Sequence, residues 1–179
     1  MVDLHRRNFM RAKQVSTPAA IRLPWTLDET IFTQGCTQCG DCISACEENI
    51  ISKGDGGFPE INFSDGECTF CQKCIAVCKE PLFNTLDATP WQLNIDITAD
   101  CLATKQVHCQ ICQDSCETQA IVFTHLHASV PQPSITLKDC NGCGACVAVC
   151  PESAIKLSST SNELASKKLS MSSVGAHHE

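Results

Sequence analysis

Short β-like runs rich in apolar residues recur along the chain. They are "NIIS" (49–52), "PEINF" (59–63), "LFNT" (82–85), "WQLNIDI" (91–97), "AIVF" (120–123), "SITL" (134–137) and "AIKL" (154–157). In "INF" (61–63) and "SITL", apolar and polar residues alternate with a period of two, which is typical of half-buried strands. Turn signals such as "KGDGG" (53–57) and "VPQP" (130–133) lie between the runs. The pattern therefore predicts short strands joined by tight turns.

Sixteen cysteines divide into four groups of four that alternate with these strands. The groups are Cys36, Cys39, Cys42 and Cys46; Cys68, Cys71, Cys74 and Cys78; Cys101, Cys109, Cys112 and Cys116; and Cys140, Cys143, Cys146 and Cys150. Aligned on their second members, the groups recur every 32 to 38 residues, which indicates an internal repeat. In each group the third and fourth cysteines are four residues apart, which places them on one face of a short helix. The predicted unit is strand, cysteine loop, helical turn and strand.

The composition leaves little material for an ordinary hydrophobic core. Hydrophobic residues make up 43% of the chain, but this includes the sixteen cysteines, and there are seven Phe, two Trp and no Tyr. Small domains of this kind usually depend on disulfides or metals. A disulfide scaffold would need export, and the basic start with Arg6 and Arg7 resembles a twin-arginine signal but lacks its apolar region. We therefore expect a cytoplasmic protein whose reduced cysteines bind metal.

Charge is distributed unevenly along the chain. The net charge is −7, and residues 1–22 carry +4, which leaves −11 on the rest. We interpret residues 1–30 as a basic arm that contacts a protein partner or, weakly, an anionic membrane surface, or that is simply solvated. The acidic body argues against nucleic acid binding. The Ser-rich residues 158–179 are expected to form a disordered tail, in which His177 and His178 are either metal ligands or plain tail.

The fourth group has the spacing C-x2-C-x2-C-x3-C followed by Pro151, which is the ligand run of bacterial ferredoxins. Three closely spaced thiolates can hold three corners of a [4Fe–4S] cubane, while the fourth binds the neighbouring cluster. Four such motifs predict four [4Fe–4S] clusters with all sixteen cysteines as iron ligands. A zinc site needs only four ligands and would leave a third closely spaced cysteine without a role.

The pairing of the motifs is open at this stage. In a sequential scheme the first motif pairs with the second and the third with the fourth, so that Cys78 joins the first three cysteines of group one and Cys46 joins those of group two. In a nested scheme the first motif pairs with the fourth and the second with the third. The sequential scheme predicts an α+β fold of two tandem bacterial ferredoxin-like 2[4Fe–4S] lobes, residues 31–90 and 91–157, with short helices and small antiparallel hairpins.

The third group departs from the others because seven residues separate Cys101 from Cys109. We keep Cys101 as a ligand, since its cluster would otherwise have three. His108 in this gap is either a hydrogen-bond donor or substitute ligand, or a surface residue. His125 and His127 alternate like solvent-facing strand residues.

The two tryptophans, Trp25 and Trp91, have two interpretations, since each could be an exposed anchor at an interface or a cap on a thin core. The sequence shows no nucleophile–base pair, phosphate loop or flavin signature, so we do not expect an enzyme.

The chain also resembles the NapF family, the ferredoxin-type accessory proteins of periplasmic nitrate reductase systems. The likeness covers residues 1–157, from "RRNFMRAK" through "RLPW" to "NGCGACVAVCPESAI". It is most specific in "GGFPEINFSDGECTFC" and in "QICQDSCETQAI" after the long gap of the third group. The resemblance implies a cytoplasmic protein that binds the precursor of the nitrate reductase catalytic subunit and assists its maturation, including iron–sulfur cluster assembly, by supplying electrons.

Two other functions fit the same motifs. One is a plain electron-transfer ferredoxin or the wiring subunit of a membrane quinol and nitrate respiratory chain. The other is a donor that transfers its clusters to an apo-protein. One observation for each would separate these functions. Capture of the unexported precursor would support the maturation role, reduction by a quinol system would support electron transfer, and loss of iron to an apo-partner would support cluster donation.

Overall fold

The computed structural model describes residues 20–91, 93–125 and 129–159, in which helices and strands are few and short. The elements are α2 (Glu29–Gly35), α3 (Asp41–Ser44), β1 (Ile51–Lys53), η1 (Asp55–Gly57), β2 (Pro59–Ile61), α4 (Lys73–Ala76), β3 (Leu93–Ile97), α5 (Ile111–Asp114), β4 (Ile121–Thr124), β5 (Gln132–Ile135), α6 (Ala145–Ala148) and β6 (Ile155–Ser159). No helix of this described part is long and apolar enough to cross a membrane. The α+β class with small antiparallel strand pairs is confirmed.

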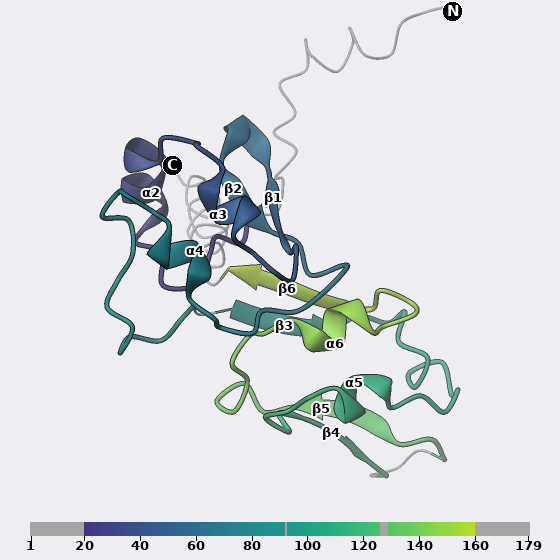
Figure 1. The fold of residues 1–179 in the computed structure, drawn as a ribbon. Helices are drawn as coiled ribbons and strands as arrows, with labels where there is room; N and C mark the ends of the chain where they lie inside the picture. Colours follow the sequence, from purple (N-terminus) through teal and green to yellow (C-terminus); the bar gives the residue numbers. More distant parts are fainter. Residues whose placement is uncertain (1–19, 92, 126–128, 160–179) are drawn as a thin grey trace, which may run out of the picture.

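The strands form two-stranded antiparallel sheets that divide the chain into a first half (20–90) and a second half (91–159) (Figure 1). The hairpins β1–β2 and β4–β5 lie within the two halves. In the second half, β3 pairs with β6 and so joins the beginning of that half to its end. A single antiparallel bridge between Thr26 and Phe83 does the same in the first half. Both halves therefore share the order of a helical turn, a hairpin and a second helical turn between two paired ends, and the first half adds α2 and η1.

Several predicted strands are shifted in the structure. "SITL" was expected to pair from residue 134, but β5 already begins at Gln132 and includes Pro133. A proline is tolerated there because a strand of a two-stranded sheet has a free edge that needs no N–H donor. "LFNT" contributes only the bridge at Phe83, since its partner segment is not a regular strand. Ser158 and Ser159, which we placed in the tail, belong to β6.

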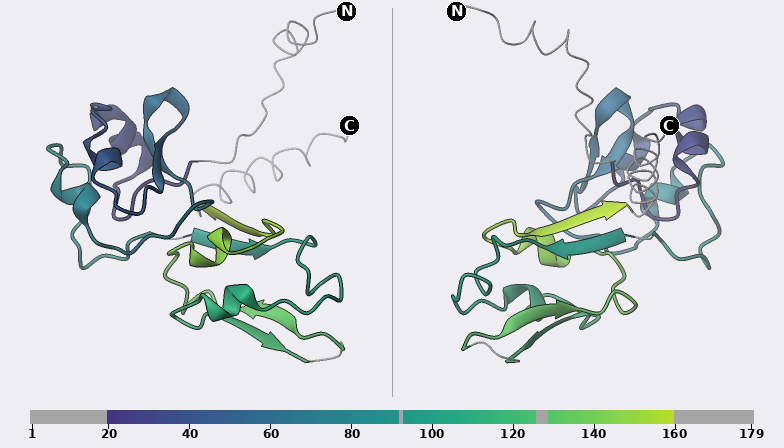
Figure 2. Two further views of the ribbon diagram at one scale, coloured as in Figure 1. Left: turned by 45° about the vertical axis from the view of Figure 1, so that its right-hand side comes forward. Right: turned by 180° about the vertical axis from the view of Figure 1, so that it is seen from behind.

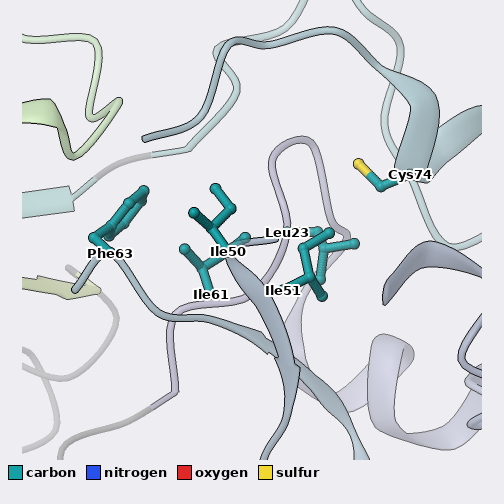
Figure 3. Close-up of a cluster of buried hydrophobic side chains, with 6 residues drawn as sticks. All are labelled: Leu23, Ile50, Ile51, Ile61, Phe63 and Cys74. Carbon is teal, nitrogen blue, oxygen red and sulfur yellow. The ribbon is translucent and has the colours of Figure 1, made fainter. Parts of the chain in front are cut away.

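The core of the first half includes residues that we had assigned to the basic arm. Its buried side chains are Leu23, Ile50, Ile51, Ile61, Phe63 and Cys74 (Figure 3). The N–H of Ile61 donates to the carbonyl of Ile21 at 2.8 Å, so the segment before α2 lies along β2. Residues 20–30 are therefore packed against the first half, whereas residues 1–19 and 160–179, with the paired arginines and the tail histidines, lie outside the described residues.

Helix α2 is an element that the strand pattern did not predict. It follows Asp28, carries Glu29 in its first turn, and buries Phe32, which is 2% exposed. Arg22 makes a bidentate ion pair with Glu29, and its guanidinium lies over the Phe32 ring at 5.4 Å. Asp28 and the acidic first turn are the usual signal for a helix start, so this element was accessible to sequence reasoning.

In the second half, a smaller core is built from two aliphatic side chains, Ile121 and Ile155, and two cysteines, Cys112 and Cys146. Because this core is small, each aliphatic side chain carries a large share of its stability. None of the buried side chains in the described part is polar or charged.

Truncation of Ile121 therefore has a clear expected effect. Ile121 is 2% exposed, whereas its neighbour Val122 on the same strand is 39% exposed. We expect Ile121→Ala to lower the free energy of unfolding by about 2–5 kcal/mol, because it leaves a cavity in the core. Val122→Ala is the matched control and should change it by no more than about 0.5 kcal/mol. Anaerobic denaturant unfolding measures both, and equal effects would contradict the assignment of the core.

Candidate metal centres

Cysteine side chains line four separate, largely apolar spaces, each of which takes cysteines from two groups. Site A is lined by Cys36, Cys39, Cys42 and Cys78. Site B is lined by Cys46, Cys68, Cys71 and Cys74. Site C is lined by Cys101, Cys109, Cys112 and Cys150. Site D is lined by Cys116, Cys140, Cys143 and Cys146. Every cysteine of the chain thus lies at one site.

This grouping is the one that the sequential scheme predicts. Helix α3 packs beside α4, and α5 beside α6, so the helical turns of paired motifs are neighbours. Each four-residue helix carries the third cysteine and ends before the fourth. We had expected both cysteines on one helix. The chain instead leaves the helix in a tighter turn, in which the N–H of Cys46 bonds to the carbonyl of Ile43 at 3.3 Å.

The loop between the first and third cysteines has the same backbone in three of the four repeats. The residues on both sides of the second cysteine have positive φ: Gln38 and Gly40, Phe70 and Gln72, and Gly142 and Gly144. Alternating left-handed residues curl a loop so that successive N–H groups point to one side, which makes an anion-binding concavity. The curled loops therefore fit a negatively charged group within the ring of thiols.

The third repeat differs in its backbone as well as in its spacing. Gln110, after the second cysteine, has φ −136°, and positive φ occurs instead at Gln106 within the long gap. Cys101 nevertheless lines site C, while His108 is exposed and is not among the residues that line it. The geometry therefore favours Cys101 over His108 as the fourth member of this site.

A further residue with positive φ lies three positions after the fourth cysteine in three repeats, at Asn49, Gln119 and Ser153. In each case its N–H donates to the carbonyl of that cysteine, at 3.0–3.2 Å. The second repeat has Pro81 at this position, and proline cannot adopt a positive φ. Sequence reasoning missed this turn because its residues share no side-chain type. The turn leads directly into the buried start of the next segment, as at Ala154, whose N–H lies 3.3 Å from the sulfur of Cys150.

The thiols are perturbed by their surroundings. Burial raises the pKa of Cys42, Cys68 and Cys112 to about 11, and that of Cys74 and Cys146 to about 12. These thiols are neutral at pH 7 without metal, so metal binding must release protons and becomes more favourable as the pH rises. Burial would also raise the pKa of Cys116, but hydrogen bonds from Thr118 and from backbone N–H groups lower it overall.

The residues present fit an iron–sulfur cluster. Within the described ranges, no three His, Cys, Asp or Glu side chains are close enough to bind one metal ion. The four thiols of each site instead stand around a shared space, as a group with four metal corners requires. The thiols supply soft ligands, the curled backbone supplies N–H donors, and the apolar lining excludes water.

The remaining candidate residues lie away from these sites or support them structurally. His125 is exposed, as predicted, and His127 lies outside the described residues. Trp25 is 5% exposed and its indole N–H donates to the carbonyl of Ala88 at 2.8 Å, so it caps the core. Trp91 is half-buried and lies between the two halves, where its indole N–H donates to the carbonyl of Asn141 at 3.1 Å.

Comparison with known families agrees with this chemistry. A family model described as a 4Fe-4S dicluster domain matches residues 35–80 and 107–167, which contain all the cysteines except Cys101. Together with the thiol-lined sites, the match defines a ferredoxin-type iron–sulfur protein.

Individual relatives show the family to which the chain belongs within this class. The chain is 47% identical to the "Ferredoxin-type protein NapF" of Haemophilus influenzae over 165 residues, which cover 87% of this chain and 94% of the relative. It is 44% identical to the protein of the same name from Escherichia coli, over 86% of this chain and 94% of the relative. It is 37% identical to one subunit of an ion-translocating oxidoreductase complex of Methanosarcina acetivorans, over 70% of this chain and 47% of that protein. The chain belongs to the NapF family of ferredoxin-type proteins.

Proposed function

We propose that the chain is a polyferredoxin with four [4Fe–4S] clusters in two tandem ferredoxin-like lobes. All sixteen cysteines are the iron ligands, four at each of sites A to D. The observation that carries the proposal is the convergence of three cysteines of one motif and one of its partner motif at every site. The segment from residue 20 belongs to the first lobe, since Leu23 and Trp25 are part of its core.

Bound clusters supply one-electron redox chemistry, and the chain controls their environment. Apolar side chains around each site exclude water, and the N–H groups of the curled loops stabilise negative charge. The second cysteines of the first two groups, Cys39 and Cys71, are exposed. One edge of sites A and B therefore lies at the surface, where a redox partner can approach.

The proposed role is a cytoplasmic one, in which the protein binds the precursor of the periplasmic nitrate reductase catalytic subunit and supplies electrons for its maturation, including iron–sulfur cluster assembly. Membership of the NapF family supports this choice, because the sequence resemblance implied that partner. The acidic body also favours a basic partner face, by electrostatic steering. The alternative is an electron-transfer ferredoxin or wiring subunit, and the likeness to a component of an ion-translocating oxidoreductase supports that second candidate.

Anaerobic affinity capture from a soluble cell fraction tests the partner. We expect the tagged, iron-loaded chain to retain the unexported catalytic subunit, and a variant with alanine at Cys39, Cys71, Cys109 and Cys143 to retain much less. If the loaded chain instead captures only a membrane oxidoreductase, the maturation role is wrong and the wiring role is favoured. Iron lost from the chain to the captured apo-subunit would mean donation of clusters rather than of electrons.

A further inference from the structure

The two halves meet at a contact formed by residues of sites B and D. The backbone N–H of Cys68 donates a hydrogen bond to the backbone carbonyl of Cys143 at 2.8 Å. Cys68 lines site B in the first half, and Cys143 lines site D in the second. The two sites are thus joined by a direct main-chain contact between one cysteine of each.

Aromatic rings surround this contact. Trp91 meets Phe63 and Phe70 edge-on, with ring centroids 5.9 Å apart in both pairs. The indole N–H of Trp91 donates to the carbonyl of Asn141, which lies two residues before Cys143. The rings therefore pack against one another between the two cysteine loops, and the Trp91 indole bonds directly to the loop of the fourth motif.

Two glycines of the fourth motif permit this approach. A Cβ at Gly142 would overlap the Trp91 indole, and a Cβ at Gly144 would overlap the Phe63 ring. Positive φ alone does not require glycine here, because Phe70 and Gln72 occupy the equivalent positions of the second motif. Close packing between the halves is the additional reason for glycine in "NGCG".

Within each half, the two sites are linked by a single turn of the chain. Cys42 of site A and Cys46 of site B are one turn apart in the chain, as are Cys112 of site C and Cys116 of site D. Helix α2, which lines site A through Phe32, and β4, which lines site C through Phe123, lie at opposite ends of the molecule (Figures 1 and 2).

We propose that the contact between Cys68 and Cys143, which we call the junction, connects all four metal sites into one series in the order A, B, D, C. The inference rests on the proposed function, since it requires a cluster at each site. Electrons pass between the halves at the junction, one at a time, so that the group at one site is oxidised as its neighbour is reduced. Sites A and C are then the two ends of the series, and the exposed Cys39 at site A gives an external donor or acceptor access to one end.

The order is tested by magnetic interaction between reduced clusters, which falls steeply with distance. One full-length variant has alanine at Cys36, Cys39, Cys101 and Cys109 and so retains sites B and D. Its counterpart has alanine at Cys68, Cys71, Cys140 and Cys143 and retains sites A and C. After reduction with dithionite, we expect the electron paramagnetic resonance spectrum of the first to be split or broadened, and that of the second to be the sum of two isolated signals.

A second pair of variants keeps every cysteine. Gly144→Ala places a methyl group against Phe63, whereas Gly40→Ala adds the same group at the equivalent position of the first motif, where nothing lies within 4 Å. Both glycines have φ +85°, so the backbone strain is matched. We expect the reduced Gly144→Ala protein to lose the part of the spin interaction that joins the halves, and Gly40→Ala to keep it.

Iron content tests the presence of the four clusters, and the spectra test their order. About sixteen iron atoms in the unmodified chain, and about eight in each quadruple variant, establish the sites. Interaction between A and C, or none between B and D, then overturns the order alone. If the quadruple variants bind fewer iron atoms than this, the test rests on the Gly144→Ala and Gly40→Ala variants. Equal spin interaction in the reduced forms of these two variants would then overturn the junction. Markedly fewer than sixteen iron atoms in the unmodified chain overturns the four-cluster proposal and the series with it.

Discussion

Replacing Cys78 with alanine is expected to remove metal from site A, although the other three cysteines of that site belong to a different motif. Cys78 lines site A with Cys36, Cys39 and Cys42, and the cysteines of its own motif line site B. Loss of one thiolate should lower the iron content of the reconstituted chain by up to about four atoms of sixteen. Iron and sulfide analysis measures the loss, and electron paramagnetic resonance shows which signal disappears.

Double variants make this test specific. Cys39→Ala combined with Cys78→Ala should lose no more than about four iron atoms, because both changes affect one cluster. Cys71→Ala combined with Cys78→Ala should lose up to about eight, because these neighbours in one motif serve two clusters. If the first double variant instead lost more iron than the second, all four cysteines of each motif would bind the same cluster. Lys79→Ala, at the exposed residue after Cys78, is the matched control and should retain all the iron.

Removal of iron from the whole protein is expected to abolish cooperative unfolding. Cys74 is part of the core of the first half, and Cys112 and Cys146 are part of the core of the second. The aliphatic side chains alone are few, so metal binding supplies most of the folding free energy, which for a domain is typically about 5–15 kcal/mol. Anaerobic chelation followed by thermal unfolding and amide hydrogen exchange measures the effect.

Hydrogen exchange in one sheet gives the sharpest readout. The β3–β6 ladder runs from Leu93 with Ser159 to Ile97 with Ile155, directly beside the thiols of the second half. We expect its amides to lose protection when iron is removed and to regain it after reconstitution with iron and sulfide. Persistent protection of this ladder in the iron-free chain would indicate an aliphatic core that is stable by itself.

Much of the candidate site was predictable because its information is local. The spacing within each cysteine group, and the alternation in runs such as "INF" and "SITL", depend only on neighbouring residues. These signals predicted the ferredoxin-type fold, the short strands and the candidate ligands. The left-handed turns at Asn49, Gln119 and Ser153 were equally local, but their residues share no side-chain type that could reveal them.

Other features depended on contacts between distant residues. The segment around Leu23 and Trp25 looked like part of a basic arm, because residues 1–22 carry a net charge of +4 and contain no continuous apolar run. It packs against the first half because β2 has a free edge and Ile61 needs a backbone partner, which Ile21 provides. Trp91 likewise had two interpretations, and only its position between the halves separates them.

The sequence by itself determined the chemistry of this protein: sixteen thiols with ferredoxin spacing, in a chain too poor in large apolar residues to form an ordinary core. Which thiols share a site was decided by the tertiary structure. Pairing depends on which helical turns pack together, and packing between α3 and α4 or between α5 and α6 brings together groups more than 30 residues apart. The contact of Cys68 with Cys143 is a property of the fold for the same reason, since it needs Gly142 against the Trp91 indole and Gly144 against the Phe63 ring of the first half.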